Sequence, residues 1–514
     1  MGMGVRRSGG RQRVNGGRLP RVLLFAVVLA LSLQLYTRDN HFSWLYHNDE
    51  SSKVSQVTDA IRNFNHPPLM LTLADGVARL TGRNADPQAV VQVGRTLSAL
   101  YLALANALLV DLAVVWAGTI TGVALGAVLL VQPDLYEIGH YFKEDTLLLL
   151  GLSASFWALA FFGAEPSRRR AVLLGVALAV LAGSKYVGWF WVVLLGGQAV
   201  VWSWRERRTA LAWVVGVFVV LTVGIYGPVL QNWNVAREAG TLEVMLLLAG
   251  DYGSGHAVPH ALYWRELGQS IPWLLLALGC LGFVLAGRER RPPGSLWILS
   301  SSAILLIALS WTAKYSDRYE LPISYLMSFV VVTGAALAWP RSGSRRWLTW
   351  LPQAGAVIVA AWLVWRAEPE AAHRAWGFRF DSRAVVREHL AQHYRGTLVL
   401  AQDEWARVDV EPRTGRSLSS WFVADLGSLD GLRRQGVTHV LVSFDVNHRF
   451  LDDSVAQFAQ ADFQRRREFY RQLFREGRVE LFLPSHQPKA LQPGLTLVDI
   501  RYQQPKNAKE FRPY

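Results

Sequence analysis

Apolar stretches recur along this chain, and they constrain its fold more than any other feature. A helix that crosses a membrane upright needs about 20 predominantly apolar residues, and several of the stretches are shorter than that. We expect an α-helical polytopic membrane protein with about eleven transmembrane helices. The pair at 171–203 also fits a re-entrant or steeply packed hairpin. The stretches lie at residues 22–36, 90–110, 112–132, 145–163, 171–183, 187–203, 210–230, 271–287, 295–312, 321–339 and 347–365.

The composition favours the same class of protein. Apolar residues make up 51% of the chain and charged residues 18%, which suits a polytopic membrane protein better than a soluble enzyme. The first apolar stretch follows a tail rich in Gly and Arg, and no small-x-small cleavage site comes after it. We therefore expect an uncleaved first span.

Arginine clusters predict the orientation in the membrane. With eleven spans, all of them fall on one side, which the positive-inside rule makes the cytoplasm. The N-terminus is then cytoplasmic and the C-terminus lies outside. The net charge of +14 reports this orientation and gives no reason to invoke nucleic acid. The clusters are Arg6, Arg7, Arg11, Arg13, Arg18 and Arg21 in the tail, then Arg168–Arg170, Arg205, Arg207 and Arg208, Arg288, Arg290 and Arg291, and Arg341, Arg345 and Arg346.

The composition changes to that of a soluble domain at about residue 367. We expect a transmembrane domain at 1–366 and an extracytoplasmic α/β domain at 367–514, because helix, glycine and strand patterns alternate there. The only cysteine, Cys280, lies in a predicted span, so the outer domain has no disulfide. The predicted helices are 382–394, 429–435 and 462–475, and the predicted strands are 397–402, 438–444, 479–483 and 495–502.

The first outer loop, residues 37–89, carries an acidic pair at the start of an amphipathic segment. From Asp49 to Phe64, four apolar residues share one helical face, which predicts an interfacial helix. Asp49 and Glu50 would occupy its first turn, where the helix dipole favours their ionised form. Such a carboxylate at the lipid–water boundary can accept a proton from an alcohol. The alternative is a pair of solvated acids that cap the helix.

Further polar residues stand at the outer ends of the predicted spans. Several basic groups there could hold a lipid phosphate or pyrophosphate. The alternative is that Lys and Arg snorkel at helix ends, which is their usual reason for being there. The candidates are His66, Arg95, Lys143, Lys185, Lys314, Arg318 and Tyr319, together with the acidic residue Asp145.

These segments, taken in order, resemble the GT-C superfamily of integral-membrane glycosyltransferases. The similar branch holds protein O-mannosyltransferases, aminoarabinose transferases acting on lipid A, and galacturonosyltransferases of lipopolysaccharide core. The likeness covers roughly residues 20–340. It rests on Asp49-Glu50, His66-Pro67-Pro68-Leu69, Arg95 to Leu100, Glu144-Asp145-Thr146-Leu147, Gly183-Ser184-Lys185 and Arg318-Tyr319-Glu320-Leu321-Pro322.

The resemblance implies a polyprenyl-phosphate sugar donor and an inverting displacement at the anomeric carbon. Asp49 would be the general base, with Glu50 and Asp145 as the other acids of the cavity. Relatives often have Lys where this chain has His66, so Arg318 or Lys185 would supply the missing charge. No nucleotide or other cofactor is expected, and a divalent cation held by the three acids is left open. The acceptor would be lipid, glycan or protein, and the location a bacterial cell (inner) membrane.

Other functions fit a chain with many spans. A lipid-linked sugar flippase or transporter would show internal repeats and ionisable groups near the bilayer midplane, and the sequence shows neither. A binding or assembly protein would use the outer domain, but it would need far fewer spans as an anchor. Within the enzyme class, the alternative is a ligase or polymerase that uses a pyrophosphate-linked glycan.

Overall fold

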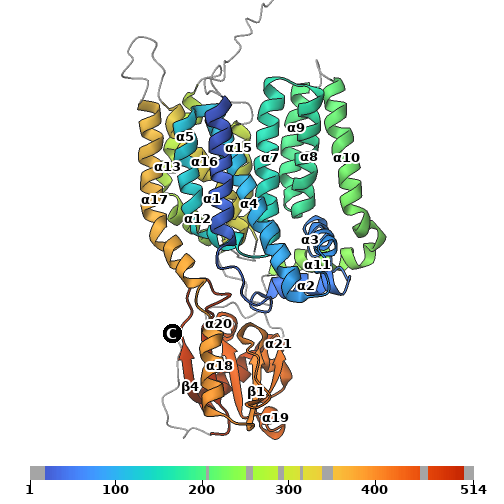
Figure 1. Ribbon diagram of the computed structural model, residues 1–514, viewed down its shortest axis with the longest axis vertical. Coiled ribbons are helices and arrows are strands. Elements are labelled where there is room, and N and C mark those ends of the chain that lie inside the picture. The colour runs from blue at the N-terminus through green and yellow to red at the C-terminus, as the bar shows by residue number, and fades with distance from the viewer. Residues whose placement is uncertain are drawn as a thin grey trace, which may run out of the picture.

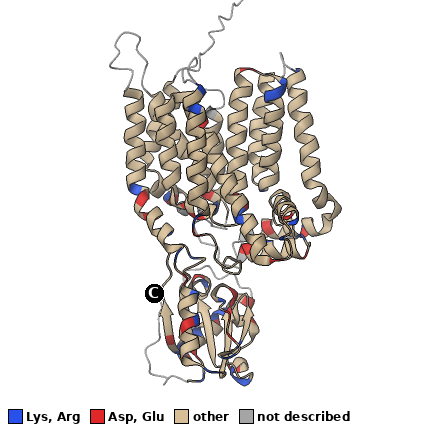
Figure 2. Cartoon of the chain, in the orientation of Figure 1, with Lys and Arg blue, Asp and Glu red and all other residues tan. Residues whose placement is uncertain are grey.

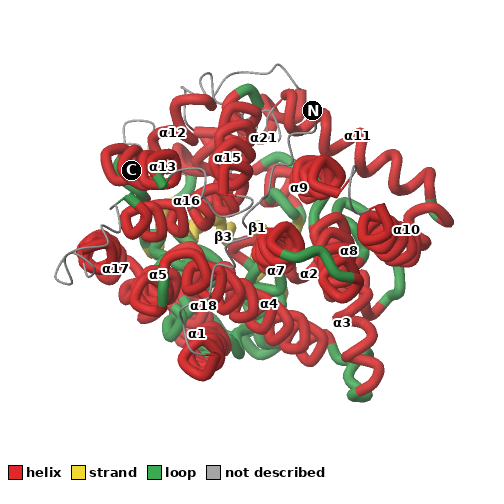
Figure 3. The backbone as a smooth tube through the Cα atoms, turned by 90° about the horizontal axis from the view of Figure 1, so that it is seen from above, coloured by secondary structure: helices red, strands yellow, loops and turns green. Residues whose placement is uncertain are grey.

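The structure is a bundle of helices with a small sheet unit at one end, and α17 runs from the bundle into that unit (Figure 1). This computed structural model describes residues 18–203, 208–249, 259–286, 295–312, 317–338, 351–451 and 461–502. One apolar core runs through the bundle. Seen from above, α1, α5 and α17 lie on one side of the bundle and α8 and α10 on the other (Figure 3).

A helix occurs at each predicted apolar stretch. Five of the described helices (α1, α4, α7, α10 and α16) are long and apolar enough to cross a membrane, or up to seven spans if the bent pairs α5–α6 and α12–α13 are counted. The polytopic helical fold is thereby confirmed, while the count of eleven spans stays a prediction. The helices are α1 (Arg18–Thr37), α4 (Pro87–Ala117), α5 (Thr119–Val131), α6 (Pro133–Gly139), α7 (Glu144–Ala164), α8 (Arg168–Ser184), α9 (Gly188–Ser203), α10 (Arg208–Gln231), α11 (Trp233–Ala249), α12 (Pro259–Ser270), α13 (Trp273–Leu285), α15 (Ser295–Ser310), α16 (Asp317–Leu337) and α17 (Leu351–Gly377).

Charged residues gather at the two ends of the bundle and in the sheet unit, while the middle of the bundle is nearly free of them (Figure 2). At the end where α1 begins, Arg21 pairs with Asp111 of α4. The Asp111 carboxylate also accepts a hydrogen bond of 2.6 Å from Trp157. The predicted arginine clusters at 205–207, 288–291 and 341–346 lie outside the described residues.

The first outer loop forms two short helices, α2 (Asn48–Thr58) and α3 (Leu69–Leu80), beside the bundle (Figure 1). The predicted helix at 49–64 is too long, because Ala60 and Phe64 adopt left-handed backbone angles, with φ of 57° and 55°. Helical periodicity therefore stops at Thr58, and Ile61 is 72% exposed and does not share the buried face. The N-terminus of α2 is capped by the His47 side chain.

The C-terminal region contains a five-stranded sheet with the order β2-β1-β3-β5-β4. β1 pairs in parallel with β2 and β3, whereas β5 pairs antiparallel with β3 and β4. The predicted elements are all present, and β2 and α20 are additional. The strands are β1 (Leu398–Asp403), β2 (Gly415–Ser420), β3 (His439–Ser443), β4 (Arg478–Leu483) and β5 (Leu495–Asp499). The helices are α18 (Ser382–His393), α19 (Leu429–Arg434), α20 (Phe444–Leu451) and α21 (Ala461–Glu476).

Two helices of the bundle touch backbone to backbone through glycines. A methyl group added at Gly334 of α16 would lie 2.1 Å from the carbonyl oxygen of Gly279 of α13. One added at Gly282 would lie 2.0 Å from the carbonyl oxygen of Gly334. Small residues let helices in a membrane approach this closely. Because backbone cannot give way as a side chain can, these positions tolerate no larger residue.

We predict that Gly334→Ala destabilises the protein, by about 1–3 kcal/mol, since α13 and α16 must move apart. The matched control is Gly224→Ala in α10, where an added methyl group meets no atom within 4 Å. Thermal unfolding of the two variants in the same detergent makes the comparison. Equal midpoints would show that the α13–α16 contact is not tight.

Candidate active site

The outer loop and the outer ends of several spans meet in one cluster of ionised side chains. It draws on the first turn of α2, the start of α7, the turn between α8 and α9, and the start of α16. Nearly all of the predicted site residues belong to it. Lys314 is the exception, because it lies outside the described residues.

Arg95 of α4 and Glu50 of α2 form a buried pair. The guanidinium donates two hydrogen bonds to the Glu50 carboxylate, at 2.9 and 2.6 Å, and both side chains are 0% exposed. Its other donors reach the carbonyl oxygens of Asn40, Phe42 and Ser43. Both side chains are buried and use their hydrogen-bonding groups on each other and on the loop backbone, so this pair holds the loop in place.

Asp49, the neighbour of Glu50, faces solvent. Its carboxylate pairs with Lys143, at the start of α7, and accepts a hydrogen bond of 2.8 Å from Arg318 of α16. Asp49 is 44% exposed and Arg318 42%, whereas Lys143 is 1% exposed. The N-terminus of α2 adds its dipole to these two cations. Asp49 is therefore an accessible carboxylate held against two positive groups.

The His47 side chain helps to hold Asp49 in this position. Its Nδ1 accepts a hydrogen bond of 3.2 Å from the backbone N–H of Asp49. Desolvation, together with the nearby Lys143 and Arg318, holds the pKa of His47 well below its ordinary value. The ring is therefore neutral at neutral pH, as an accepting Nδ1 requires.

Lys185 and Asp145 form another ion pair of the cluster. Lys185 Nζ lies 2.6 Å from Asp145 Oδ1, and the ammonium also faces the Tyr319 ring at 5.7 Å. The other Asp145 oxygen, Oδ2, is buried and accepts no hydrogen bond from the residues that the structure describes. Asp145 and Lys185 thus lie together as predicted, but each is mainly the counter-ion of the other.

The ion pair between Lys53 and Glu144 includes a lysine that was not among the predicted site residues. Lys53 Nζ lies 2.9 Å from Glu144 Oε2, and both side chains are buried. Helical spacing could have identified Lys53, because it stands four residues after Asp49 on α2. His66 Nε2 lies 4.0 Å from the same Glu144 oxygen. Desolvation lowers the pKa of His66, so its imidazole is neutral at neutral pH and offers a hydrogen bond but no charge to an anion.

In the ion pairs of the cluster that the structure describes, cations outnumber carboxylates by one. Five cations, Lys53, Arg95, Lys143, Lys185 and Arg318, face four carboxylates, Asp49, Glu50, Glu144 and Asp145. The most exposed members of each sign are Arg318 and Asp49. Such an arrangement can hold an anion beside a carboxylate that accepts protons.

The three acids for which a shared divalent cation was left open do not converge. Each is neutralised by its own cation, and among the described residues their oxygens do not gather within 4.8 Å. The described residues do gather His439, Glu480 and Asp499 within that distance in the sheet unit. There, Arg478 and Arg501 pair with the two carboxylates, which opposes a divalent cation.

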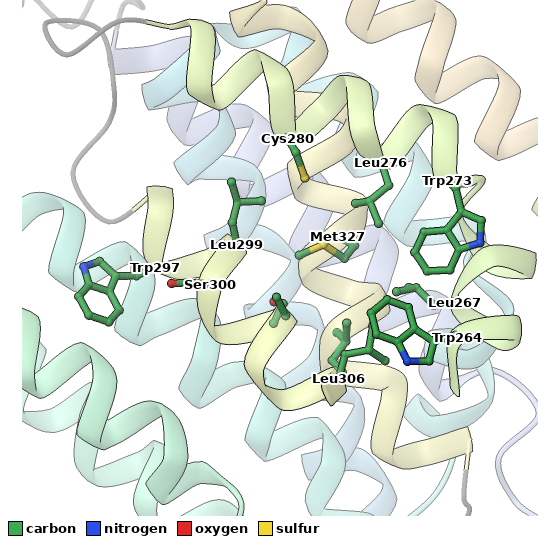
Figure 4. A pocket seen from close by; sticks show the side chains of 13 residues that line it. Trp264, Leu267, Trp273, Leu276, Cys280, Trp297, Leu299, Ser300, Leu306 and Met327 are labelled. Carbon is green, nitrogen blue, oxygen red and sulfur yellow. The ribbon is translucent and has the colours of Figure 1, made fainter. Parts of the chain in front are cut away.

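An apolar pocket of about 740 Å³ lies among α12, α13, α15 and α16 (Figure 4). Its walls include Trp264, Trp273, Cys280 and Met327. α16 begins with Arg318 and reaches Met327 about 14 Å further along its axis. The same helix thus links the charged cluster to an apolar pocket inside the bundle.

The fold was compared with known proteins. No protein-family model matches the chain, and no curated protein matches it. Among solved structures, ArnT from Cupriavidus metallidurans, bound to undecaprenyl phosphate, aligns over 93% of this chain and 97% of its own, with a TM-score of 0.52 and 14% sequence identity. The chain has the GT-C fold. At such low identity the likeness establishes the fold, as the sequence predicted, and leaves the chemistry to the site.

Two other solved structures align more weakly. The archaeal oligosaccharyltransferase AglB from Archaeoglobus fulgidus, in complex with an inhibitory peptide and a dolichol-phosphate, has a TM-score of 0.49 and 11% identity over 89% of this chain and 72% of its own. The S. cerevisiae protein O-mannosyltransferase Pmt1-Pmt2 complex, bound to the sugar donor, has a TM-score of 0.36 and 20% identity over 47% of this chain and 36% of its own.

We predict that Glu50→Gln destabilises the protein strongly, by about 3–5 kcal/mol, because it leaves the Arg95 guanidinium buried without its counter-ion. The matched control is Asp59→Asn, a change of an exposed acid at the end of the same helix, which should alter stability by less than about 0.5 kcal/mol. Thermal unfolding in detergent measures both. If Glu50→Gln unfolds like the control, the pair does not hold the loop.

Proposed function

We propose that this protein is a glycosyltransferase that moves a sugar from a polyprenyl-phosphate donor to an acceptor hydroxyl at the outer face of a membrane. The observation that carries the proposal is the position of Asp49. It is the accessible carboxylate of the cluster, and it lies between Lys143 and Arg318, two cations suited to a phosphate. The fold shared with ArnT, which was solved with undecaprenyl phosphate, supports the choice of donor.

The donor phosphate takes its place among Arg318, Lys143 and Lys185. A phosphate oxygen competes with the Asp49 carboxylate for the first two cations, because both are anions at the same positive site. Donor binding therefore releases Asp49 from its counter-ions. A carboxylate that loses two cations becomes a stronger proton acceptor, so the base is activated only when the donor is present.

The polyprenyl chain of the donor enters the apolar pocket. The pocket begins about one and a half turns along α16 from Arg318, at Ile323, so a phosphate at Arg318 places the first isoprenyl units beside Ile323 and Met327. Apolar chain buried there adds binding free energy in proportion to the area removed from water. The headgroup and the tail are thus both held by the first half of α16.

The transfer is a single displacement with inversion. Asp49 accepts the proton of the acceptor hydroxyl while the hydroxyl oxygen forms a bond to the anomeric carbon. The bond between that carbon and the phosphate oxygen breaks, and the electron pair leaves with the polyprenyl phosphate. Lys143, Lys185 and Arg318 stabilise the charge that develops on this leaving group. Asp145 orients Lys185, and Glu50 holds the loop that carries Asp49.

The positive-inside rule supports the proposed orientation in the membrane, because the arginine clusters of the sequence belong to the opposite end of the bundle. With that end in the cytoplasm, the reaction occurs on the outer side, where no nucleotide sugar is available. A lipid carrier supplies the activated sugar in its place. We propose a bacterial cell membrane as the location, with the sheet unit outside, and we propose that the reaction needs neither a nucleotide nor another cofactor.

Transfer by the purified chain is the direct test. The full-length protein in detergent receives a radiolabelled polyprenyl-phosphate sugar and an envelope fraction of the host that contains lipids and glycans. Sugar should pass to the envelope fraction, with release of an equal amount of polyprenyl phosphate. A flippase releases no lipid phosphate, and a polymerase of pyrophosphate-linked glycans releases pyrophosphate-linked lipid instead. Either result would reject the proposal.

We predict that Asp49→Asn abolishes nearly all transfer, by about 10²-fold or more, because the amide cannot accept the proton. Its unfolding temperature should fall by less than that of Glu50→Gln, because Asp49 is 44% exposed and only the Lys143 side of the ion pair is buried. Asp59→Asn, on the same helix, is the matched control and should retain full activity. Wild-type turnover by Asp49→Asn would exclude Asp49 as the base.

We predict that Arg318→Gln weakens binding of polyprenyl phosphate about 10- to 100-fold, because one charge-assisted contact is lost. Arg79→Gln, which changes an exposed arginine of α3, is the control and should bind normally. Titration with polyprenyl phosphate in detergent, followed by native mass spectrometry, gives the affinities. Equal binding by both variants would place the phosphate elsewhere.

A further inference from the structure

A second concave site lies away from the charged cluster, at the junction of α17 and α18. This α17–α18 groove has a volume of about 350 Å³, and the segment after β4 forms its other wall. Two aromatic side chains line it, Trp376 with 57% and Phe380 with 42% of their surface exposed, and their ring centroids lie 4.0 Å apart. Large aromatic side chains exposed together mark a binding surface.

The aromatic pair stands beyond the apolar part of α17. The apolar run of this helix ends at Trp365, and charged residues follow from Arg366 onward. Trp376 stands 11 residues beyond Trp365 on the same helix, about 16 Å of helix length. The headgroup layer adds only about 5–8 Å on each side of the hydrocarbon. On this spacing we place Trp376 and Phe380 outside the headgroup layer.

Polar side chains complete the groove. The Asp381 carboxylate, the His373 and His486 imidazoles and the Gln492 amide stand beside the aromatic rings. A lipid chain or an apolar peptide would desolvate these groups without giving them hydrogen bonds. A sugar ring matches both features, because its C–H face stacks on an aromatic ring while its hydroxyls bond to carboxylate, imidazole and amide groups.

The groove is tied directly to the segment that carries the proposed base. Tyr46 donates a hydrogen bond of 2.5 Å to Asp381, and Arg387 bridges the Tyr46 hydroxyl and Asp381 at 3.0 and 3.1 Å. Tyr46 precedes Asp49 by three residues, a length of chain that spans at most about 11 Å. A molecule seated in the groove is thus close enough to present a neighbouring part to the active site.

We infer that the α17–α18 groove, built from Trp376, Phe380, Asp381 and the two histidines, binds a saccharide unit of the acceptor. This inference rests on the proposed function, because it assigns the groove to the acceptor of the same reaction. It implies that the acceptor is a glycan or a glycolipid that already carries sugar. The bound unit fixes the acceptor, and a hydroxyl nearer the bundle receives the new sugar.

Binding without turnover separates this inference from the reaction itself. The full-length Asp49→Asn variant in detergent is titrated with soluble oligosaccharides released from the envelope glycans of the host, and saturation-transfer NMR detects the bound sugars. Trp376→Ala and Phe380→Ala are each added to this background. Trp365→Ala is the matched control, because it removes an exposed tryptophan from the same helix outside the groove.

The groove variants should bind the oligosaccharides about tenfold more weakly than the Trp365→Ala control. In the active protein, Trp376→Ala should raise KM for the acceptor and leave the affinity for polyprenyl phosphate unchanged. If Trp376→Ala and Phe380→Ala bind like the control, or if the parent binds no oligosaccharide, the inference is wrong even when transfer occurs. If oligosaccharides bind in the groove and no donor sugar is transferred, the proposed function fails and the saccharide site stands.

Discussion

The position of the first outer loop depends on one buried guanidinium. Arg95 uses all five of its N–H donors, two on Glu50 and three on carbonyl oxygens of residues 40–43, and the Phe42 ring covers it at 3.5 Å. In a site without water, each of these bonds must be kept, because an unpaired charge there costs several kcal/mol. The loop is therefore fixed on both sides of Asp49, although Asp49 itself faces solvent.

Burial divides four neighbouring acids into two kinds. Glu50, Glu144 and Asp145 are 0–3% exposed, and each is held by a cation of its own. Asp49 is the accessible one, and one of its two cations, Arg318, is exposed as well. An incoming anion can exchange for the Asp49 carboxylate, but it cannot enter the buried pairs without leaving a charge unpaired. The buried pairs thus shape a site in which the ionic contacts of Asp49 with Lys143 and Arg318 are the ones that can change.

The first outer loop also contacts the sheet unit and so helps to hold it against the bundle. Arg383 of α18 is buried, donates to the carbonyl oxygens of Ala490 and Trp405 at 2.6 Å, and stacks on the Tyr46 ring at 4.5 Å. Tyr46 in turn bonds to Asp381. The sheet unit is therefore packed against the segment that leads into α2, and a ligand held by that unit has a fixed position relative to Asp49.

Local sequence patterns were sufficient to predict the periodic elements of this protein. Apolar stretches of helical length located the bundle helices, and alternating helix, glycine and strand signals located β1, β3, α18 and α21, because these patterns are local. β2 was missed because an edge strand with half of its residues exposed has no apolar pattern. The charged residues of the candidate site were also identified from the sequence, but their ion-pair partners could be identified only from the fold. Asp49 and Arg318 stand 269 residues apart, and Arg95 and Arg318 look alike along the chain. In the folded protein Arg95 is buried against Glu50, whereas Arg318 is exposed. The burial of an ionic group depends on segments that are distant in the sequence and meet in space.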